Sequence, residues 1–281
     1  MGKTAFRFGT VGTPKSKPKS PGGSVGGIIH IAELELTAME LGWVRSVRVS
    51  ESTATKIKEA AEENDVALSV HAPYYINLNG DDEEWPKSRK RLMDAARAGF
   101  QSGATDIVFH PGSYFDRPPA EVLEVVLPRL ADCVAELREE DNPVILRPET
   151  MGKGAMLGSL DDALEMSSLE GVEPCLDFAH LHARTGDGLM NSYDEWMEVF
   201  EQYADELGPE SLQRLHGHFS GIEYTEKGEQ NHLMLEESDF DYTGWLKALQ
   251  AVEAGGRLLC ESPVMEDDAR YVKDQWLELV G

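Results

Sequence analysis

Histidines and carboxylates stand at the ends of several short apolar segments of this 281-residue chain. His71 ends the segment 68–71, His110 ends 107–110, and Glu261 ends 258–261. A single residue of this kind is more often structural, but here seven of the eight histidines and three acids are expected at one edge. Neutral imidazole and carboxylate are the ligands that zinc and manganese take. The sequence therefore predicts a metal centre built from His71, His110, Glu149, Asp177, His180, His218, His232 and Glu261.

The number of candidate ligands points to more than one ion. A single catalytic zinc needs only three protein ligands. Eight candidates are enough for two or three ions that are bridged by shared carboxylates. Such clusters suit phosphodiester hydrolysis, because the ions activate water, neutralise phosphate and hold the leaving oxygen.

The elements that must position these residues alternate along the chain. Amphipathic segments such as 52–64 and 119–137 have apolar residues at helical spacing. They separate eight β-rich segments: 6–9, 46–49, 68–71, 106–110, 144–147, 174–177, 212–218 and 257–261. The alternation predicts an α/β fold, a (β/α)₈ TIM barrel in one domain spanning residues 1–281, with a doubly wound open sheet as the alternative. In such barrels the chemistry lies at the C-terminal ends of the strands. The Pro/Gly/Lys-rich segment 10–27 is expected to be a long loop at that end.

Charge is the unusual feature of the composition. There are 51 Asp and Glu against 26 Lys and Arg, a formal net charge of −25. Self-repulsion of this size is relieved by salt, so we expect a salt-adapted (halophilic) host, with an ordinary acidic cytosolic protein as the alternative. Three isolated cysteines suggest neither a disulfide framework nor a thiolate zinc site. With no membrane-length apolar run and no signal-peptide profile, we expect a cytoplasmic protein without a membrane partner.

Six motifs in this order resemble the endonuclease IV family, the apurinic/apyrimidinic (AP) endonucleases on a xylose isomerase-like barrel. The resemblance runs from the second predicted strand to the C-terminus. It is carried by residues 69–78 (SVHAPYYINL), 108–113 (VFHPGS), 148–153 (PETMGK), 175–180 (CLDFAH), 218–222 (HFSGI) and 259–263 (LCESP). It implies a hydrolase, an endodeoxyribonuclease of base excision repair that cleaves DNA on the 5′ side of an abasic deoxyribose.

The resemblance also implies roles for individual residues. His71, His110 and Glu149 would hold a first zinc-type ion. Glu149 would bridge to a second ion, which is completed by Asp177, His218 and Glu261. His180 and His232 would hold a third. Two or three Zn²⁺ ions are expected, with Mn²⁺ as a partial substitute. Glu261 and Glu149 are the expected catalytic residues, and double-stranded DNA with abasic sites is the expected partner of a monomer.

Two places depart from the family pattern or leave a choice open. The family places an Asp-x-His pair in the loop after the seventh strand, but Gln230 stands at the Asp position here, so Glu229 is the substitute candidate. His216 and His218 share one strand face, and His218 is chosen because it lies nearer the rim, with His216 in a deeper layer. Tyr74 and Tyr75 follow the first His motif and are expected to contact the substrate by insertion into the base stack, with packing over the exit of the third strand as the alternative.

The acidic charge and the shared fold leave a second function open beside DNA cleavage. The acidic composition opposes DNA binding, although two or three ions would add about 4–6 positive charges at the site. Basic clusters at Lys15, Lys17 and Lys19, and at Lys87 and residues 89–91, would offer local contacts. The alternative is a metal-dependent sugar isomerase or epimerase of the same superfamily, which the fold alone does not separate from a nuclease.

Overall fold

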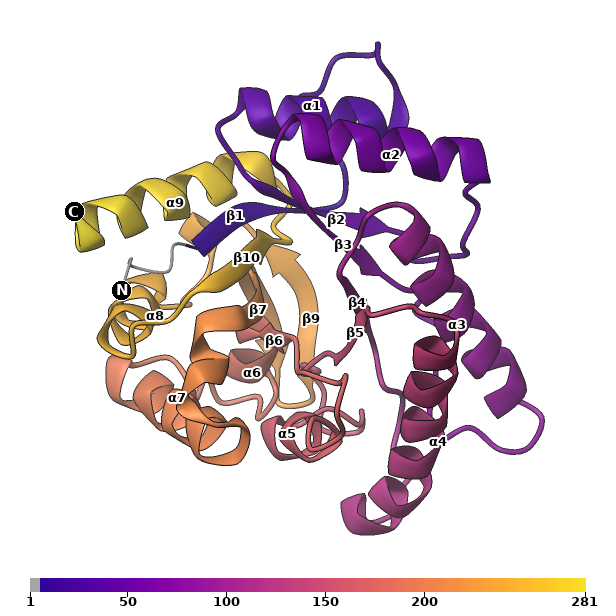
Figure 1. Ribbon diagram of the computed structural model, residues 1–281. Helices are drawn as coiled ribbons and strands as arrows, with labels where there is room; N and C mark the ends of the chain where they lie inside the picture. Colours follow the sequence, from indigo (N-terminus) through magenta and orange to yellow (C-terminus); the bar gives the residue numbers. More distant parts are fainter. Residues whose placement is uncertain (1–5) are drawn as a thin grey trace.

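Eight short parallel strands form one curled sheet, and helices cover its outer face (Figure 1). The computed structural model describes residues 6–281. The strands pair in the order β5-β4-β3-β2-β1-β10-β7-β6. Their bounds are β1 (Phe6–Val11), β2 (Ala38–Gly42), β3 (Ala67–His71), β4 (Asp106–Phe109), β5 (Ile145–Pro148), β6 (Leu176–Asp177), β7 (Leu215–Phe219) and β10 (Gly256–Cys260).

Two isolated bridges join the ends of this sheet. Leu146 pairs in parallel with Val172, and Glu149 pairs in parallel with Cys175. These bridges connect β5 with the segment that leads into β6, so the sheet closes on itself. The predicted (β/α)₈ barrel is confirmed, and the doubly wound open sheet is excluded.

The longer helices bury an apolar stripe against the barrel. In α2 this stripe is Ala54, Ile57, Ala60 and Ala61, and Ser50 caps the helix by accepting a hydrogen bond from the backbone N–H of Thr53. The helix α4 runs unbroken through Pro128. The full set is α1 (Gly23–Glu33), α2 (Glu51–Glu63), α3 (Trp85–Gln101), α4 (Pro119–Glu139), α5 (Leu160–Met166), α6 (Phe178–Ala183), α7 (Tyr193–Leu207), α8 (Tyr242–Ala251) and α9 (Glu266–Val280), with short 3₁₀ turns η1 (Pro209–Arg214) and η2 (Leu235–Glu237). No helix of residues 6–281 is long and apolar enough to cross a membrane.

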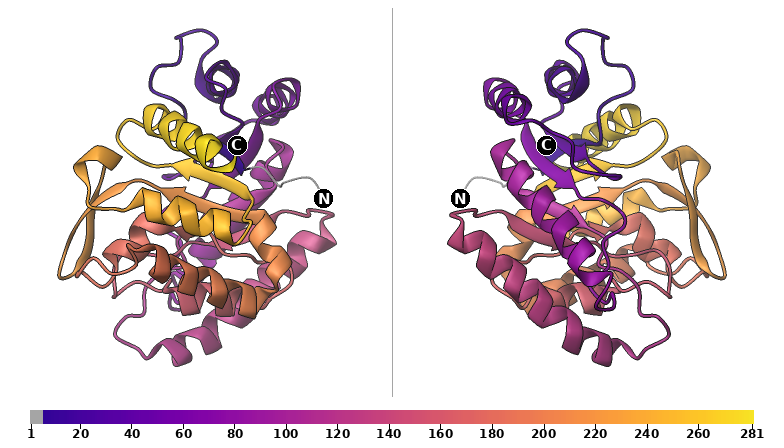
Figure 2. Two further views of the ribbon diagram at one scale, coloured as in Figure 1. Left: turned by 90° about the vertical axis from the view of Figure 1, so that its left-hand side faces the viewer. Right: turned by 90° about the vertical axis from the view of Figure 1, so that its right-hand side faces the viewer.

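An antiparallel hairpin interrupts the strand–helix alternation after β7. It consists of β8 (Gly221–Thr225) and β9 (Gly228–Leu233). Figure 2 shows this hairpin standing at the edge of the molecule, beyond the strands of the barrel. It brings a histidine of the loop region, His232, back to the C-terminal ends of the strands.

Three predictions about the elements were wrong. The second strand is Ala38–Gly42 and not 46–49, which lies in the following loop. The alternation of residues 46–49 imitated a half-exposed strand, whereas the real strand is buried on both faces and its first four residues show no alternation. The loop expected at 10–27 is shorter, because β1 extends to Val11 and α1 begins at Gly23. The strand expected at 212–218 begins only at Leu215, because its first three residues belong to η1.

Candidate metal centre

All eight predicted ligands lie at the end of the barrel where the strands have their C-terminal ends. His71 is the last residue of β3, while His110, Glu149 and Glu261 directly follow β4, β5 and β10. Asp177 ends β6 and caps α6 by accepting the backbone N–H of His180. His218 lies in β7, and His232 lies on β9. Residues from six strand exits and one hairpin therefore meet at one end of the barrel.

Glu149 lies at the middle of this group. Its Oε2 is 3.2 Å from His71 Nε2 and 3.3 Å from His110 Nε2. Its Oε1 is 3.4 Å from His218 Nδ1 and 3.5 Å from His180 Nδ1. The Glu149 side chain is fully buried, so one carboxylate faces four imidazole rings away from water.

Glu261 makes a second, outer connection. Its Oε1 lies 3.2 Å from His218 Nδ1, and its Oε2 lies 3.2 Å from His232 Nε2. Asp177 Oδ2 lies 3.3 Å from His180 Nδ1. Together these contacts link the eight residues into one continuous cluster.

The donor atoms fall into three overlapping sets, each with its atoms within 4.8 Å of one another. The first is His71, His110 and Glu149; the second is Glu149, Asp177, His218 and Glu261; the third is Asp177, His180 and His232. Among residues 6–281, Glu149 Oε1, Asp177 Oδ2 and His218 Nδ1 are buried without a hydrogen-bond partner. Buried polar atoms in that state are costly, so this donor set fits divalent cations bridged by shared carboxylates.

Neighbouring groups fix the outer nitrogens of the rings. His71 Nδ1 lies 3.0 Å from the backbone carbonyl of Ala72, and His180 Nδ1 lies 2.9 Å from the carbonyl of Thr150. His232 Nδ1 lies 2.7 Å from Ser220 Oγ. An N–H donated to such a partner leaves the opposite nitrogen, Nε2, as a free ligand atom, which is the usual arrangement behind metal-binding histidines.

The pKa values of the cluster histidines are set by the carboxylates that pack against their rings. Burial pushes the pKa of His71 down, but the Glu149 carboxylate outweighs it and raises the pKa to about 9. Burial acts likewise on His180, and Asp177 and Glu229 raise its pKa to about 9. These rings therefore carry protons that balance the carboxylates at neutral pH. Divalent ions would take over that role, and their binding would release protons.

Glu229 reaches the cluster although it stands one residue before the family's acid position. Its Oε2 lies 3.1 Å from His180 Nε2 and accepts the backbone N–H of Gly152 at 3.1 Å. Its Oε1 lies 3.4 Å from Lys153 Nζ. Gln230, by contrast, is exposed, and its side-chain amide donates to the backbone carbonyl of Glu229.

A pocket of about 350 Å³ opens directly above the cluster. It is lined by His71, Tyr74, His110, Met151, Lys153, Met156, His180, Glu229, His232 and Glu261. Tyr74 stacks on His110 with ring centroids 5.0 Å apart, and Tyr75 is 64% exposed. A larger hollow of about 610 Å³ lies at the opposite ends of the strands, away from these ligands.

Three residues next to the cluster were not predicted as site residues. Glu40, His216 and Cys175 lie fully buried one layer deeper. Glu40 was missed because β2 was misplaced, although an acid inside the apolar segment 38–41 was a visible signal. His216 does lie in a deeper layer, and Cys175 was set aside because it is an isolated cysteine.

Two expectations about the surroundings need correction. His182 does not join the cluster, because its ring contacts the Leu189 carbonyl and Asp239, so fewer than seven histidines converge. The basic residues of the cluster at Lys87 and residues 89–91 form ion pairs within the protein, so they are not free to contact DNA. Arg89 pairs with Glu136. The other pairs in this cluster are Lys87 with Glu83, Lys90 with Asp94 and Arg91 with Glu84.

Two known proteins are similar to this chain in sequence over most of their length. An uncharacterized protein of Methanocaldococcus jannaschii is 37% identical over 97% of both chains. A probable endonuclease 4 of Streptomyces coelicolor is 28% identical over 75% of this chain and 78% of its own. This likeness confirms the resemblance to endonuclease IV proteins.

Solved structures show the same fold. Endonuclease IV from Thermus thermophilus superposes with a TM-score of 0.71 at 20% identity, covering 98% of this chain and 100% of the other. A D-tagatose 3-epimerase-like protein superposes equally well, with a TM-score of 0.71 at 19% identity and 98% coverage of both chains. The model of one family, described as xylose isomerase-like TIM barrel, matches residues 28–278. The chain therefore belongs to the xylose isomerase-like TIM barrel family.

Proposed function

We propose that this chain is a metal-dependent AP endonuclease that hydrolyses the phosphodiester 5′ to an abasic site in double-stranded DNA. The observation that carries the proposal is the position of Glu149, which lies within 3.5 Å of four imidazole nitrogens. Glu149 and Asp177 each belong to two of the three overlapping ligand sets. Such shared carboxylates suit a cluster of ions that surrounds one phosphate.

The eight predicted residues, with Glu229, would hold two or three ions of the zinc class, with Mn²⁺ as a partial substitute. Such ions supply an activated water and neutralise the phosphate charge. Glu261 would orient or deprotonate that water; in support, its side chain lines the pocket and is 14% exposed. Its two oxygens face His218 and His232, so a proton accepted there would remain inside the cluster.

The substrate would enter through the pocket above the cluster. Tyr74 lines this pocket and Tyr75, the next residue, is exposed, and an exposed aromatic ring can stack on an unpaired base. Arg45 and Arg48 lie exposed in the neighbouring loop after β2. Within residues 6–281 neither has an ion-pair partner, which leaves both available for phosphate. The backbone N–H of Tyr74 donates to the carbonyl of Val44, so this loop and the tyrosines are held together.

A sugar isomerase or epimerase is the alternative, favoured by the equal structural likeness to a D-tagatose 3-epimerase-like protein. Moving a proton along a sugar requires one or two metals and a general base. It does not require five imidazoles together with three carboxylates. The ligand set therefore favours hydrolysis.

One paired experiment tests the proposal. The purified protein is loaded with Zn²⁺ or Mn²⁺ in high salt and incubated with a duplex that carries one abasic-site analogue. The undamaged duplex and the Glu149→Gln variant serve as controls. Incision only at the lesion, with a 3′-hydroxyl on the upstream fragment, is expected. An intact lesion duplex beside turnover of ketohexoses would reject the proposal in favour of the epimerase.

A further inference from the structure

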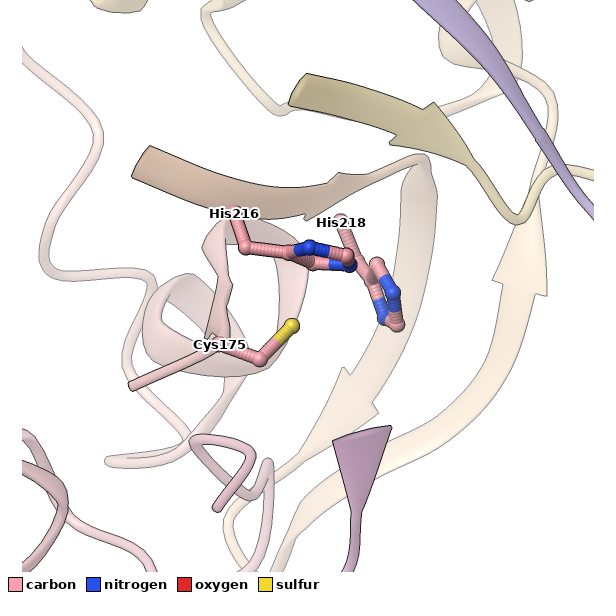
Figure 3. A group of neighbouring side chains, drawn as sticks. All are labelled: Cys175, His216 and His218. Carbon is pink, nitrogen blue, oxygen red and sulfur yellow. The ribbon is translucent and has the colours of Figure 1, made fainter. Parts of the chain in front are cut away.

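Beneath the rim cluster, three side chains converge in the interior of the barrel. Cys175 precedes β6, and His216 and His218 come from β7. One ligand atom from each lies within 4.8 Å of the other two, and all three residues are at most 1% exposed. Figure 3 shows the thiol and the two imidazole rings turned toward one another. Only His218 belongs to the rim ligand sets as well.

Glu40 determines which nitrogens of these rings remain available. Its Oε2 is 3.1 Å from His216 Nε2 and accepts the hydroxyl of Ser69 at 2.7 Å. Its Oε1 lies 3.2 Å from His218 Nε2. One carboxylate therefore faces the Nε2 atoms of both rings. A carboxylate on the far nitrogen is the arrangement that orients metal-binding histidines and fixes their tautomer.

The opposite nitrogen of His218 lies near the carboxylates of Glu149 and Glu261, whereas no carboxylate of residues 6–281 pairs with that of His216. Among residues 6–281, His216 Nδ1 and His218 Nδ1 are both fully buried without a hydrogen bond. An N–H donated by His216 Nε2 to Glu40 leaves His216 Nδ1 with a bare lone pair, while His218 Nε2 lies 3.2 Å from Glu40 Oε1 without a hydrogen bond. Buried ring nitrogens without a hydrogen bond are costly, and a cation bound between them and the thiol would compensate that cost.

We propose that Cys175 Sγ, His216 Nδ1 and His218 Nδ1 form an inner binding site for one transition-metal ion of the zinc class. A thiolate with two imidazoles selects zinc-like ions and disfavours Mg²⁺ and Mn²⁺, which prefer oxygen ligands. A thiol that loses its proton to a bound ion brings one negative charge, and Glu40 supplies another from behind the two rings.

The inner site is linked to the proposed metal centre through one atom. His218 Nδ1 also lies 3.4 Å from Glu149 Oε1 and 3.2 Å from Glu261 Oε1. One nitrogen lone pair binds one ion, so an ion at His218 lies either among the rim carboxylates or between Cys175 and His216. The inference thus deepens the proposed function: the ion assigned to His218 has a second, sulfur-containing position one layer deeper.

Cobalt substitution tests the sulfur ligand directly. Co²⁺ bound by a thiolate gives a near-ultraviolet sulfur-to-metal charge-transfer band that nitrogen and oxygen ligands do not give. The band is expected in the unmodified protein and lost in Cys175→Ser. Cys133→Ser and Cys260→Ser are matched controls, because both cysteines are also buried but lie outside the ligand set. A cobalt-loaded protein without the band, or a band that survives in Cys175→Ser, would overturn the inference.

X-ray absorption at the zinc edge needs no variant and so does not depend on whether Cys175→Ser folds. A sulfur scatterer at about 2.3 Å is expected in the zinc-loaded protein. A shell of nitrogen and oxygen alone would overturn the inner site. Incision of the abasic duplex is measured on the same preparation. A sulfur shell without incision would reject the endonuclease function and support the inner site. Incision without a sulfur shell would support the endonuclease function and reject the inner site.

Discussion

Glu229 Oε2 lies 3.1 Å from His180 Nε2 because the hairpin that carries Glu229 contains a β-bulge. Glu223 pairs with Asn231, and the next residue, Tyr224, pairs with Glu229, so Gln230 is the extra residue of the bulge. In a regular strand, residues 229 and 232 would point to opposite faces. One inserted residue restores a common face for Glu229 and His232.

Glu229→Gln is predicted to weaken the third ion specifically. The amide keeps the volume but removes the charge that faces His180, so metal content should fall by about one ion per chain at limiting zinc. We expect zinc affinity at this site to fall roughly 10–100-fold or more. Equilibrium dialysis with elemental analysis measures it. Gln230→Ala is the matched control on the bulge, and equal loss from both variants would contradict the role of Glu229.

Glu149→Gln is predicted to remove the centre as a whole. Glu149 belongs to two ligand sets and contacts four rings, so its loss affects at least two ions. Single-turnover incision should fall by about 10³-fold or more, since one misplaced electrostatic group alone costs 10²–10³. Glu165→Gln, an exposed acid on the nearby helix α5, should leave both metal content and incision unchanged. A Glu149→Gln protein with full metal content would contradict the bridging role.

Tyr75→Ala is predicted to weaken substrate binding without unfolding the protein. The side chain is 64% exposed, so its removal should change the free energy of unfolding by only about 0.5 kcal/mol. Lost stacking of about 1–3 kcal/mol should raise the Kd for the lesion duplex roughly 5–150-fold. Phe100→Ala removes a partly exposed ring at the opposite end of the barrel and serves as the control. Fluorescence anisotropy with labelled duplex decides, and equal Kd values for Tyr75→Ala and unmodified protein would exclude the contact.

The sequence was sufficient for the barrel and for the eight rim residues because both follow local rules. Apolar runs mark buried strands, and residues at their ends must meet at one rim. The residues that were missed depend on longer-range information. Glu40 could be assigned to the barrel interior only when β2 was placed at Ala38–Gly42, and Cys175 could be assigned to the site only when its bridge to Glu149 was known. Glu229 shares a face with His232 only because of a β-bulge, and the spacing of residues in the sequence does not indicate that a strand contains an extra residue.

Salt is predicted to stabilise the protein. The net charge of −25 is spread over a surface where most carboxylates are solvent-exposed, and repulsion among them opposes folding. Raising KCl from 0.1 M to 1 M shortens the screening length from about 10 Å to about 3 Å. The Tm measured by circular dichroism should therefore rise with KCl and rise much less with sorbitol of equal osmolality. A Tm that is insensitive to KCl would contradict the expected salt adaptation.

Acid is predicted to destabilise the base of the barrel through Asp106. Its carboxylate is buried, and burial alone would raise its pKa. Arg147 Nε lies 2.5 Å from Oδ1, and an Arg257 nitrogen lies 3.0 Å from Oδ2, so the two guanidinium groups hold the pKa of Asp106 well below its usual value.

A pKa that is lower in the folded than in the unfolded chain stabilises the fold above the unfolded value, about 3.9, and this stabilisation disappears as the pH falls toward the folded value. Asp106→Asn should therefore lower the free energy of unfolding by about 3 kcal/mol at pH 7. The reason is that the substitution leaves two buried guanidinium groups without their shared carboxylate. The difference in the free energy of unfolding between the variant and the unmodified protein should become smaller below pH 4. Urea unfolding between pH 7 and pH 3 in the presence of EDTA measures it, with the surface pair variant Asp94→Asn as control. A difference that stays constant down to pH 3 would show that the pKa of Asp106 is not lowered by folding.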